Sequence, residues 1–344
     1  MSHDVLRNIW FLLIGALLTG YAILDGFDLG AGVLHLFVAR NDKERRQILN
    51  AVGPFWDGNE VWLLTGGGAM FAAFPHVYAT VFSGFYLALM LVLFALILRA
   101  VSFEFRSRME SPRWRSVWDV IFFLGSLIPA LLTGVAVGNV IKGVPLHENM
   151  EFAGNFFTLL NPFSLLVGLT GLAMFVTHGA IYLVMKTNGP VRERARKWAF
   201  GAWTALLVLV ILTIIAAWLE APARFQGKPA LVWIVPILTL VFMVLTRIQL
   251  TKERPGWAFL FSALTIAGLM GQFGVGCYPY LLPARNQVDI LGYNGLSIYN
   301  ASASQLTLLV MLIIALIGVP IMLAYTSYIY YAFRGKVVVE KEGY

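Results

Sequence analysis

The sequence predicts an all-α polytopic membrane protein with nine transmembrane helices, and three observations support this fold class. Of the 344 residues, 59% are hydrophobic, and the mean hydropathy is +0.77. Charged residues make up 12%, about half of the roughly 25% found in soluble domains. The apolar residues form runs of about 20, the length that crosses a bilayer as a helix. We therefore expect one integral membrane domain over residues 1–344.

The first predicted helix follows a short polar N-terminus that lacks the cleavage site of a signal peptide. The nine predicted helices lie at about 9–37, 54–74, 78–99, 117–141, 162–185, 198–219, 230–249, 257–281 and 306–332. A basic stretch at 40–46 separates the first two, and a short turn at 74–78 ends the second. Two long, weakly charged loops at 142–161 and 282–305 follow the fourth and the eighth. This order predicts two four-helix bundles plus one additional helix.

Basic residues predict the orientation, because cytoplasmic loops of membrane proteins are rich in lysine and arginine. One side of the predicted topology holds 20 of the 25: Arg40, Lys43, Arg45, Arg46, Arg99, Arg106, Arg108, Arg113, Arg115, Lys186, Arg192, Arg194, Arg196, Lys197, Arg247, Lys252, Arg254, Arg334, Lys336 and Lys341. The other side holds Arg7, Lys142, Arg224, Lys228 and Arg285. The N-terminus is therefore expected outside and the C-terminus in the cytoplasm. The net charge of +7 then reflects this topology, and we expect no nucleic-acid partner.

Four acidic residues in the first two predicted helices are the strongest functional signal. Asp25 and Asp28 lie three apart, as do Asp57 and Glu60, so each pair shares a helical face. The glycines at 26, 30 and 32 would let another helix approach the first pair closely. A carboxylate in a bilayer costs roughly 2.5–3.5 kcal/mol on insertion scales, so such residues usually carry protons or bind ions. With the predicted orientation, all four acids fall in the cytoplasmic leaflet.

The same residues also allow simpler roles. Asp57 could cap the N-terminus of its helix, and Asp28 could pair with a basic residue of the 40–46 stretch. His178 is the one histidine in the middle of a predicted span, where it could ligate haem iron or, more commonly, form hydrogen bonds within the bundle. The single cysteine, Cys277, excludes an internal disulfide and a cysteine-rich metal site.

Several motifs together resemble subunit II of the cytochrome bd quinol oxidases over about residues 5–333. They are Gly26–Gly32 (GFDLGAG), Arg40–Arg46 (RNDKERR), Trp56–Trp62 (WDGNEVW), Phe82–Tyr86 (FSGFY), Arg99–Arg106 (RAVSFEFR), Gly134–Asn139 (GVAVGN), Gly154–Pro162 (GNFFTLLNP) and Ala303–Thr307 (ASQLT). The order and spacing of these motifs make the resemblance specific.

The resemblance implies a function within an enzyme complex of the bacterial cytoplasmic (inner) membrane. Such oxidases oxidise a quinol and reduce dioxygen to water, which builds a proton gradient without pumping. Two b-type haems and haem d belong to the partner, subunit I, and this chain would bind no haem or metal directly. It would be inactive alone, and would support assembly, haem retention in subunit I and part of a cytoplasmic proton route. Other contacts would be membrane lipid, in some members a structural quinone, and small single-helix accessory subunits.

The resemblance assigns the proton route to particular residues. Asp57 matches the family's channel aspartate at the subunit interface, and Trp56 and Asn59 belong to the same motif. Asp25 and Asp28 match the acids of an Asp-Gly-Phe-Asp motif. Glu60 departs from the family pattern, where Gln is frequent, and the outer segment 221–230 is shorter than in many members. Two rival functions are a proton-coupled transporter, for which no inverted repeat is evident, and a purely structural scaffold.

Overall fold

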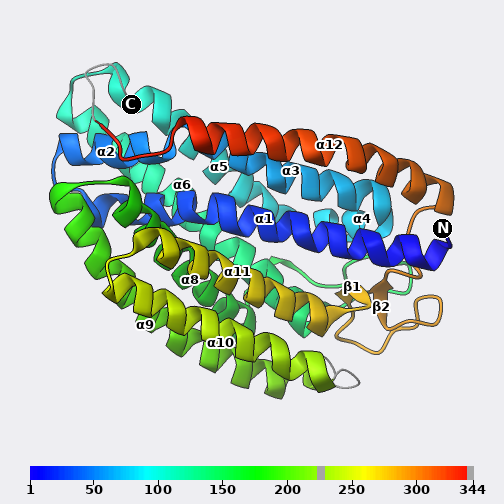
Figure 1. Ribbon diagram of the computed structural model, residues 1–344. Coiled ribbons are helices and arrows are strands. Elements are labelled where there is room, and N and C mark those ends of the chain that lie inside the picture. Colours follow the sequence, from blue (N-terminus) through cyan, green and yellow to red (C-terminus); the bar gives the residue numbers. More distant parts are fainter. Residues whose placement is uncertain (223–228, 339–344) are drawn as a thin grey trace.

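The computed structural model describes residues 1–222 and 229–338, which form a bundle of long helices (Figure 1). The helices are α1 (His3–Val38), α2 (Asp42–Val52), α3 (Trp56–Ala73), α4 (Pro75–Gly84), α5 (Tyr86–Phe105), η1 (Arg106–Arg108), α6 (Pro112–Lys142), α7 (Phe156–Leu159), α8 (Pro162–Lys186), α9 (Gly189–Glu220), α10 (Pro229–Thr251), α11 (Pro255–Cys277) and α12 (Gln305–Ala332). Strands β1 (Tyr280–Pro283) and β2 (Gly295–Ser297) pair antiparallel. Within the described ranges, eight helices are long and apolar enough to span a membrane. The prediction of a helical multi-pass protein is therefore confirmed.

The predicted second span corresponds to α3, which is not among those eight helices. It is 18 residues long, and its first turns contain Asp57, Asn59 and Glu60, which lower its hydropathy. In the bundle α3 nevertheless packs along α1 and contacts α12 (Figure 1). The polar first turns and the apolar later turns of α3 therefore form one continuous helix that is packed within the bundle.

Several predicted helix boundaries differ from those of the structure, and two of the differences have a clear physical cause. The predicted span 78–99 is divided between α4 and α5, because Gly84 adjoins the ring of Phe152 from the 142–161 loop and the helix breaks at Phe85. The predicted span 257–281 ends at Cys277, because the residue before Pro279 is disfavoured in a helix. The chain continues as β1.

The basic stretch between the first two predicted spans contains a helix that was not predicted. The side chain of Asn41 accepts a hydrogen bond from the Glu44 amide and so caps the start of α2. One face of α2 buries Ile48, Leu49 and Val52 in the core. This amphipathic helix is too short to span a bilayer, so a search for long apolar runs misses it.

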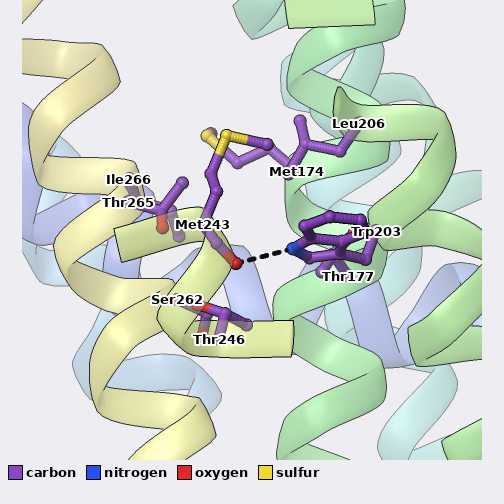
Figure 2. Close-up of a pocket in the computed structure, with 9 residues that line it drawn as sticks. All are labelled: Met174, Thr177, Trp203, Leu206, Met243, Thr246, Ser262, Thr265 and Ile266. Atoms are coloured by element: carbon purple, nitrogen blue, oxygen red, sulfur yellow. Dashed lines mark hydrogen bonds between the residues drawn. The ribbon is translucent and has the colours of Figure 1, made fainter. Parts of the chain in front are cut away.

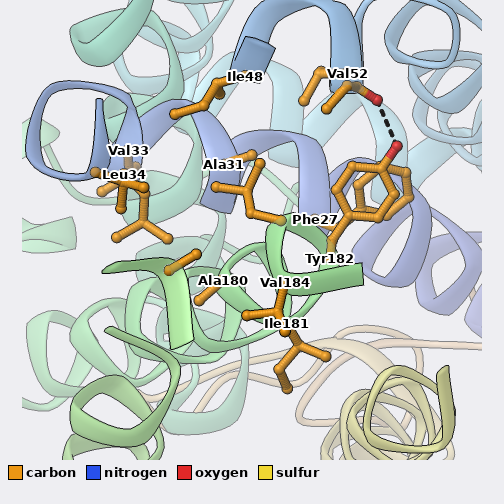
Figure 3. Packing of buried hydrophobic residues seen from close by; sticks show 14 of the residues in the cluster. Phe27, Ala31, Val33, Leu34, Ile48, Val52, Ala180, Ile181, Tyr182 and Val184 are labelled. Carbon is orange, nitrogen blue, oxygen red and sulfur yellow. Dashed lines mark hydrogen bonds between the residues drawn. The ribbon is translucent and has the colours of Figure 1, made fainter. Parts of the chain in front are cut away.

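The predicted close approach at the glycines of α1 is confirmed. A Cβ on Gly30 would lie 3.1 Å from the Cα of Gly179 in α8, and a Cβ on Gly26 would meet the ring of Phe175. Figure 3 shows the core on either side of this contact, where Phe27 stacks on Tyr182 with ring centroids 4.1 Å apart. Small residues therefore bring α1 and α8 together and fix where the polar residues of α1 lie.

The ends of the bundle differ in composition. In Figure 1, α2 and the segment that follows α12, up to residue 338, lie at one end, and the N-terminus lies with β1 and β2 at the other. The connections that carry most of the basic residues, including 106–115 and 186–197, belong to the end with α2. Of the charges used to predict orientation, Arg224, Lys228 and Lys341 lie outside the described residues.

Candidate functional site

Three polar side chains of α1 form one wall of a buried cluster between α1, α3 and α5. Tyr21, Asp25 and Asp28 are spaced by four and three residues, which places them on the same helical face. Both aspartates have no exposed side-chain surface. Neither oxygen of Asp25 has a hydrogen-bond partner among the described residues, nor do Asp28 Oδ1 and the Tyr21 hydroxyl. Buried groups of this kind are usually satisfied by ordered water.

A chain of hydrogen bonds reaches Asp28 from the last helix. The Tyr330 hydroxyl of α12 donates to Asn59 Oδ1 over 3.1 Å. Asn59 Nδ2 in turn donates to Asp28 Oδ2 over 2.6 Å and to the Leu24 carbonyl over 3.1 Å. Asn59 was predicted from its motif, whereas Tyr330 was not, because nothing local marks it among the tyrosines of its helix.

Arg99 of α5 is a second residue of the cluster that the sequence did not assign to the site. Its Nη1 donates to Glu60 Oε1 over 2.8 Å, and its Nη2 lies 3.6 Å from Asp25 Oδ1. The Arg99 side chain is fully buried, and that of Glu60 is 22% exposed. The signal was present in the sequence, because an arginine inside an apolar run is costly. It was missed because the helix was expected to end at residue 99, and it continues to Phe105.

Asp57 and Trp56 lie apart from this cluster. Asp57 is exposed on the outer surface of α3, although Glu60, three residues later, faces Arg99. Trp56 stacks on Phe103 of α5 with ring centroids 5.3 Å apart. The structure therefore brings together Asp25, Asp28, Asn59 and Glu60 of the predicted residues.

Among the described residues, the capping bond considered for Asp57 and the ion pair considered for Asp28 are not formed. The residue at the N-cap of α3 is Phe55, with no side-chain capping bond, and Asp57 belongs to the first turn. Asp28 does not pair with the basic 40–46 stretch, because Arg45 from that stretch pairs with Asp119 instead. In the described part of the chain, Asp57 makes no ion pair or hydrogen bond through its carboxylate.

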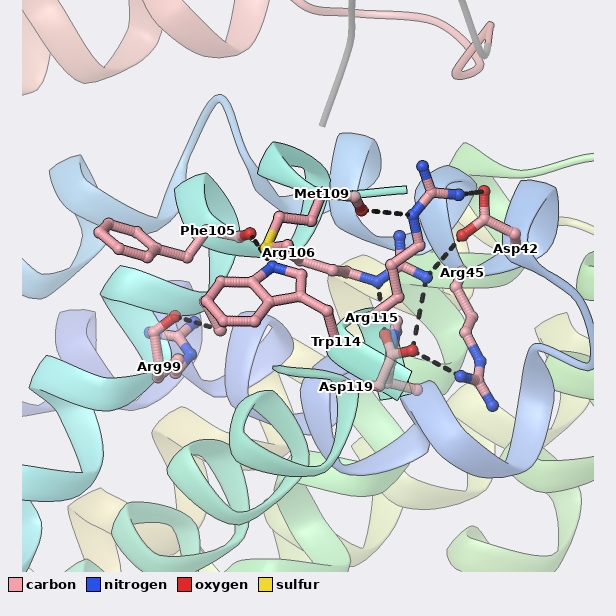
Figure 4. Close-up of polar contacts among 11 residues, drawn as sticks. Asp42, Arg45, Arg99, Phe105, Arg106, Met109, Trp114, Arg115 and Asp119 are labelled. Atoms are coloured by element: carbon pink, nitrogen blue, oxygen red, sulfur yellow. Dashed lines mark hydrogen bonds and ion pairs between the residues drawn. The ribbon is translucent and has the colours of Figure 1, made fainter. Parts of the chain in front are cut away.

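Asp119 of α6 is the centre of a separate polar network near the end with α2 (Figure 4). It accepts hydrogen bonds from Arg106 Nε and His35 Nε2, both over 2.6 Å, and from Arg45. Arg106 and Arg115 also pair with Asp42 at the start of α2. This network joins α1, α2, η1 and α6, so its evident role is to hold the helix ends together.

A further contact joins α2 to α9 through Glu44. Its carboxylate accepts hydrogen bonds from Arg194 and from the Arg40 amide. Partial burial by itself would raise the pKa of Glu44, but these hydrogen bonds hold the pKa below its ordinary value. These contacts therefore favour the charged form of Glu44, which links α2 to α9.

His178 forms hydrogen bonds within the bundle. Its Nε2 donates to the Ile23 carbonyl over 3.1 Å, and its Nδ1 accepts from the Ser262 hydroxyl over 2.6 Å. Both ring nitrogens are thus engaged, which does not fit a haem ligand. Among the described residues, no group of three or more His, Cys, Asp or Glu side chains could hold a metal ion.

Ser262 also lines a small pocket between α8, α9, α10 and α11 (Figure 2). Met174, Met243 and Trp203 form its apolar walls, and the Trp203 ring donates a hydrogen bond to the Met243 carbonyl. The pocket has room for about one water molecule. None of the residues that line it belongs to the acidic cluster, so the cluster remains the candidate site.

Comparisons with known proteins agree with these features. A sequence model of the family described as "Cytochrome bd terminal oxidase subunit II" matches residues 6–333. Cytochrome bd-I ubiquinol oxidase subunit 2 of Escherichia coli K12 is 40% identical over 375 aligned positions, which cover 99% of this chain and 97% of that protein. Cytochrome bd ubiquinol oxidase subunit 2 of Bacillus subtilis is 34% identical, covering 96% and 97%. A chain of the bd oxidase structure from Geobacillus thermodenitrificans has the same fold, with a TM-score of 0.80, 18% identity and coverage of 96% and 99%.

Proposed function

The chain belongs to the cytochrome bd terminal oxidase subunit II family, and we propose that it supplies part of the cytoplasmic proton route of such an oxidase. Membership makes it a multi-pass protein of the bacterial inner membrane and one subunit of a respiratory oxidoreductase complex whose haems lie in subunit I. Its own contribution would be to deliver protons toward the partner and to support assembly and haem retention there. The chain would be inactive without that partner.

The observation that carries this proposal is the cluster of carboxyl groups inside the bundle. Asp25 and Asp28 are fully buried, and Glu60 reaches from the same cluster toward the surface of α3. Several of their oxygen atoms have no hydrogen-bond partner among the described residues, which leaves places for water molecules between them. Carboxyl groups linked by water can pass protons by exchanging hydrogen bonds, whereas a purely structural cluster would have its polar atoms paired.

We infer that the outer face of α3 is the surface that contacts subunit I. Asp57, Val61, Leu64, Gly68 and Phe71 are spaced by four and three residues in turn, and this spacing matches the seam of two packed helices. A Cβ on Gly68 would have no atom within 4 Å, so a partner helix could approach there. A charged Asp57 facing lipid would be costly, which also favours coverage by a partner chain.

The proposed topology has nine crossings, with α3 as the second, the N-terminus outside and the C-terminus in the cytoplasm. At 1.5 Å per residue, the 18 residues of α3 extend about 27 Å, close to the thickness of the hydrocarbon core. The two proposed four-helix bundles are α1, α3, α5 with α6, and α8 to α11, with α12 as the additional helix. Within these sets α5 packs on α6 and α10 packs on α11, and α8 joins the two sets by packing on α1 and α6.

The proposed route is tested by Asp57→Asn in the assembled two-subunit oxidase. Quinol-driven oxygen consumption should fall at least about tenfold, which corresponds to about 1.4 kcal/mol in the barrier. The haem absorption bands should stay unchanged, because the Asp57 carboxylate forms no hydrogen bond or ion pair with another described residue and asparagine keeps its shape. Glu110→Gln, an exposed acid before α6, is the control and should respire normally.

The same experiment separates the relay from a scaffold. Normal oxygen consumption by the Asp57→Asn enzyme with intact haem bands would leave only a structural role for this acid. A loss of haem bands in the variant would instead assign Asp57 to assembly and haem retention.

A further inference from the structure

The buried cluster contains more acidic groups than basic ones. Asp25, Asp28 and Glu60 face a single guanidinium, that of Arg99, across α1, α3 and α5. The other side chains that face the two aspartates are Tyr21, Asn59, Tyr182 and Tyr330, from α1, α3, α8 and α12. These are neutral groups. If all three carboxyl groups were ionised, the cluster would carry two uncompensated negative charges.

Arg99 is held firmly in this position by its neighbours. A Cβ on Gly125 of α6 would lie 2.8 Å from the Cβ of Arg99 and 2.7 Å from the Ala95 carbonyl oxygen, so α6 packs directly on this part of α5. The guanidinium carbon lies 6.0 Å from the centre of the Phe103 ring. Its Nη1 is used by Glu60, whereas Nε and Nη2 have no hydrogen-bond partner and Nη2 faces Asp25.

Uncompensated charge is strongly disfavoured in such a site, because buried ions need a partner or must become neutral. One guanidinium compensates one carboxylate, and the geometry assigns that place to Glu60. The remaining two negative charges are removed if Asp25 and Asp28 are protonated. Their unpartnered oxygen atoms agree with carboxyl groups that interact with trapped water.

We propose that Arg99 is a positioning residue that sets the proton content of this cluster, so that Asp25 and Asp28 together hold two protons in the resting enzyme. The cluster is then a proton store next to the surface of α3 that carries Asp57. The use of this store in oxygen reduction rests on the proposed function. The proposal that Asp25 and Asp28 hold two protons does not depend on that function.

The test counts protonated carboxyl groups by infrared spectroscopy of the purified two-subunit oxidase. The carboxylic C=O stretching band, identified by its shift in D2O, is compared between each variant and the unsubstituted enzyme. Glu60→Gln should lower this band by one group, because Arg99 then compensates one aspartate. Arg99→Gln should raise it by one group, since Glu60 must also become protonated. Arg99→Lys, which keeps the positive charge, should leave the band unchanged.

A charge-balanced pair of substitutions provides the decisive comparison. Arg99→Gln combined with Glu60→Gln removes one positive and one negative charge, so the band should return to its original size. Glu110→Gln, an exposed acid outside the cluster, should not change it. The proposal is overturned if Glu60→Gln leaves the band unchanged. Because Glu60→Gln keeps Arg99, it still tests the proposal if the Arg99→Gln enzyme does not assemble. The result is independent of the Asp57→Asn activity test, which measures proton delivery.

Discussion

Asp119→Asn is predicted to weaken the protein by about 3–5 kcal/mol, the usual cost of breaking one partner of a buried ion pair. Asp119 has no exposed side-chain surface, and it accepts hydrogen bonds from Arg106, His35 and Arg45. Asparagine keeps the shape, but it removes the negative charge and turns an amide NH2 toward guanidinium groups that also donate. Arg106, which is 2% exposed, would then rely on Asp42 alone.

The assay is unfolding of the purified complex in detergent, followed by tryptophan fluorescence, together with oxygen consumption below the unfolding range. Glu104→Gln is the control, because Glu104 and Arg108 form a pair in which both side chains are more than half exposed. An exposed pair contributes about 0–1 kcal/mol. A loss of less than about 1 kcal/mol in Asp119→Asn would refute the reasoning that this network clamps the helix ends. Oxygen consumption should be preserved, since the network is separate from the acidic cluster.

Two further substitutions test the cluster and the packing that positions it. Asn59→Leu removes both the hydrogen bond to Asp28 and the acceptor for Tyr330. If the hydrogen bond contributes about 1.4 kcal/mol to the barrier, oxygen consumption should fall about tenfold while the haem bands stay normal. A rate within about twofold of normal would contradict this. Gly179→Leu places a Cβ 2.7 Å from the Cα of Gly30 and should cost at least about 1–3 kcal/mol of stability, seen as early unfolding and lower haem content. Gly201→Ala, at an open position of α9, should leave both unchanged.

The membrane fold could be predicted from the sequence because each span is specified locally. Apolar runs of sufficient length must form helices in a bilayer, whatever surrounds them. Two of the errors arose where contacts from elsewhere in the chain decide the outcome. Phe152 from a distant loop packs at Gly84, where one predicted helix becomes two, and α2 gains its stability by burying Ile48 and Leu49 in the core.

The candidate site was predicted in part, for a similar reason. The three-residue spacing of Asp25 and Asp28 fixes a shared face on one helix, and the structure confirms that both are buried. The same spacing did not bring Asp57 and Glu60 together, because α1 and α5 lie on the side of α3 that Glu60 faces and leave Asp57 exposed. The position of a residue on a helix can be read from the sequence, but its neighbours depend on how the helices pack.

The sequence by itself determined that this is a helical multi-pass membrane protein, and its motifs pointed to the family that the comparisons confirmed. It also determined that acidic residues are concentrated in the first two predicted helices. Only the tertiary structure decided which of them meet, and it added Arg99 and Tyr330 from α5 and α12. The physical reason is that hydropathy and helical period act over a few turns of one chain segment. A buried charge finds its partner only after helices distant in sequence have packed together.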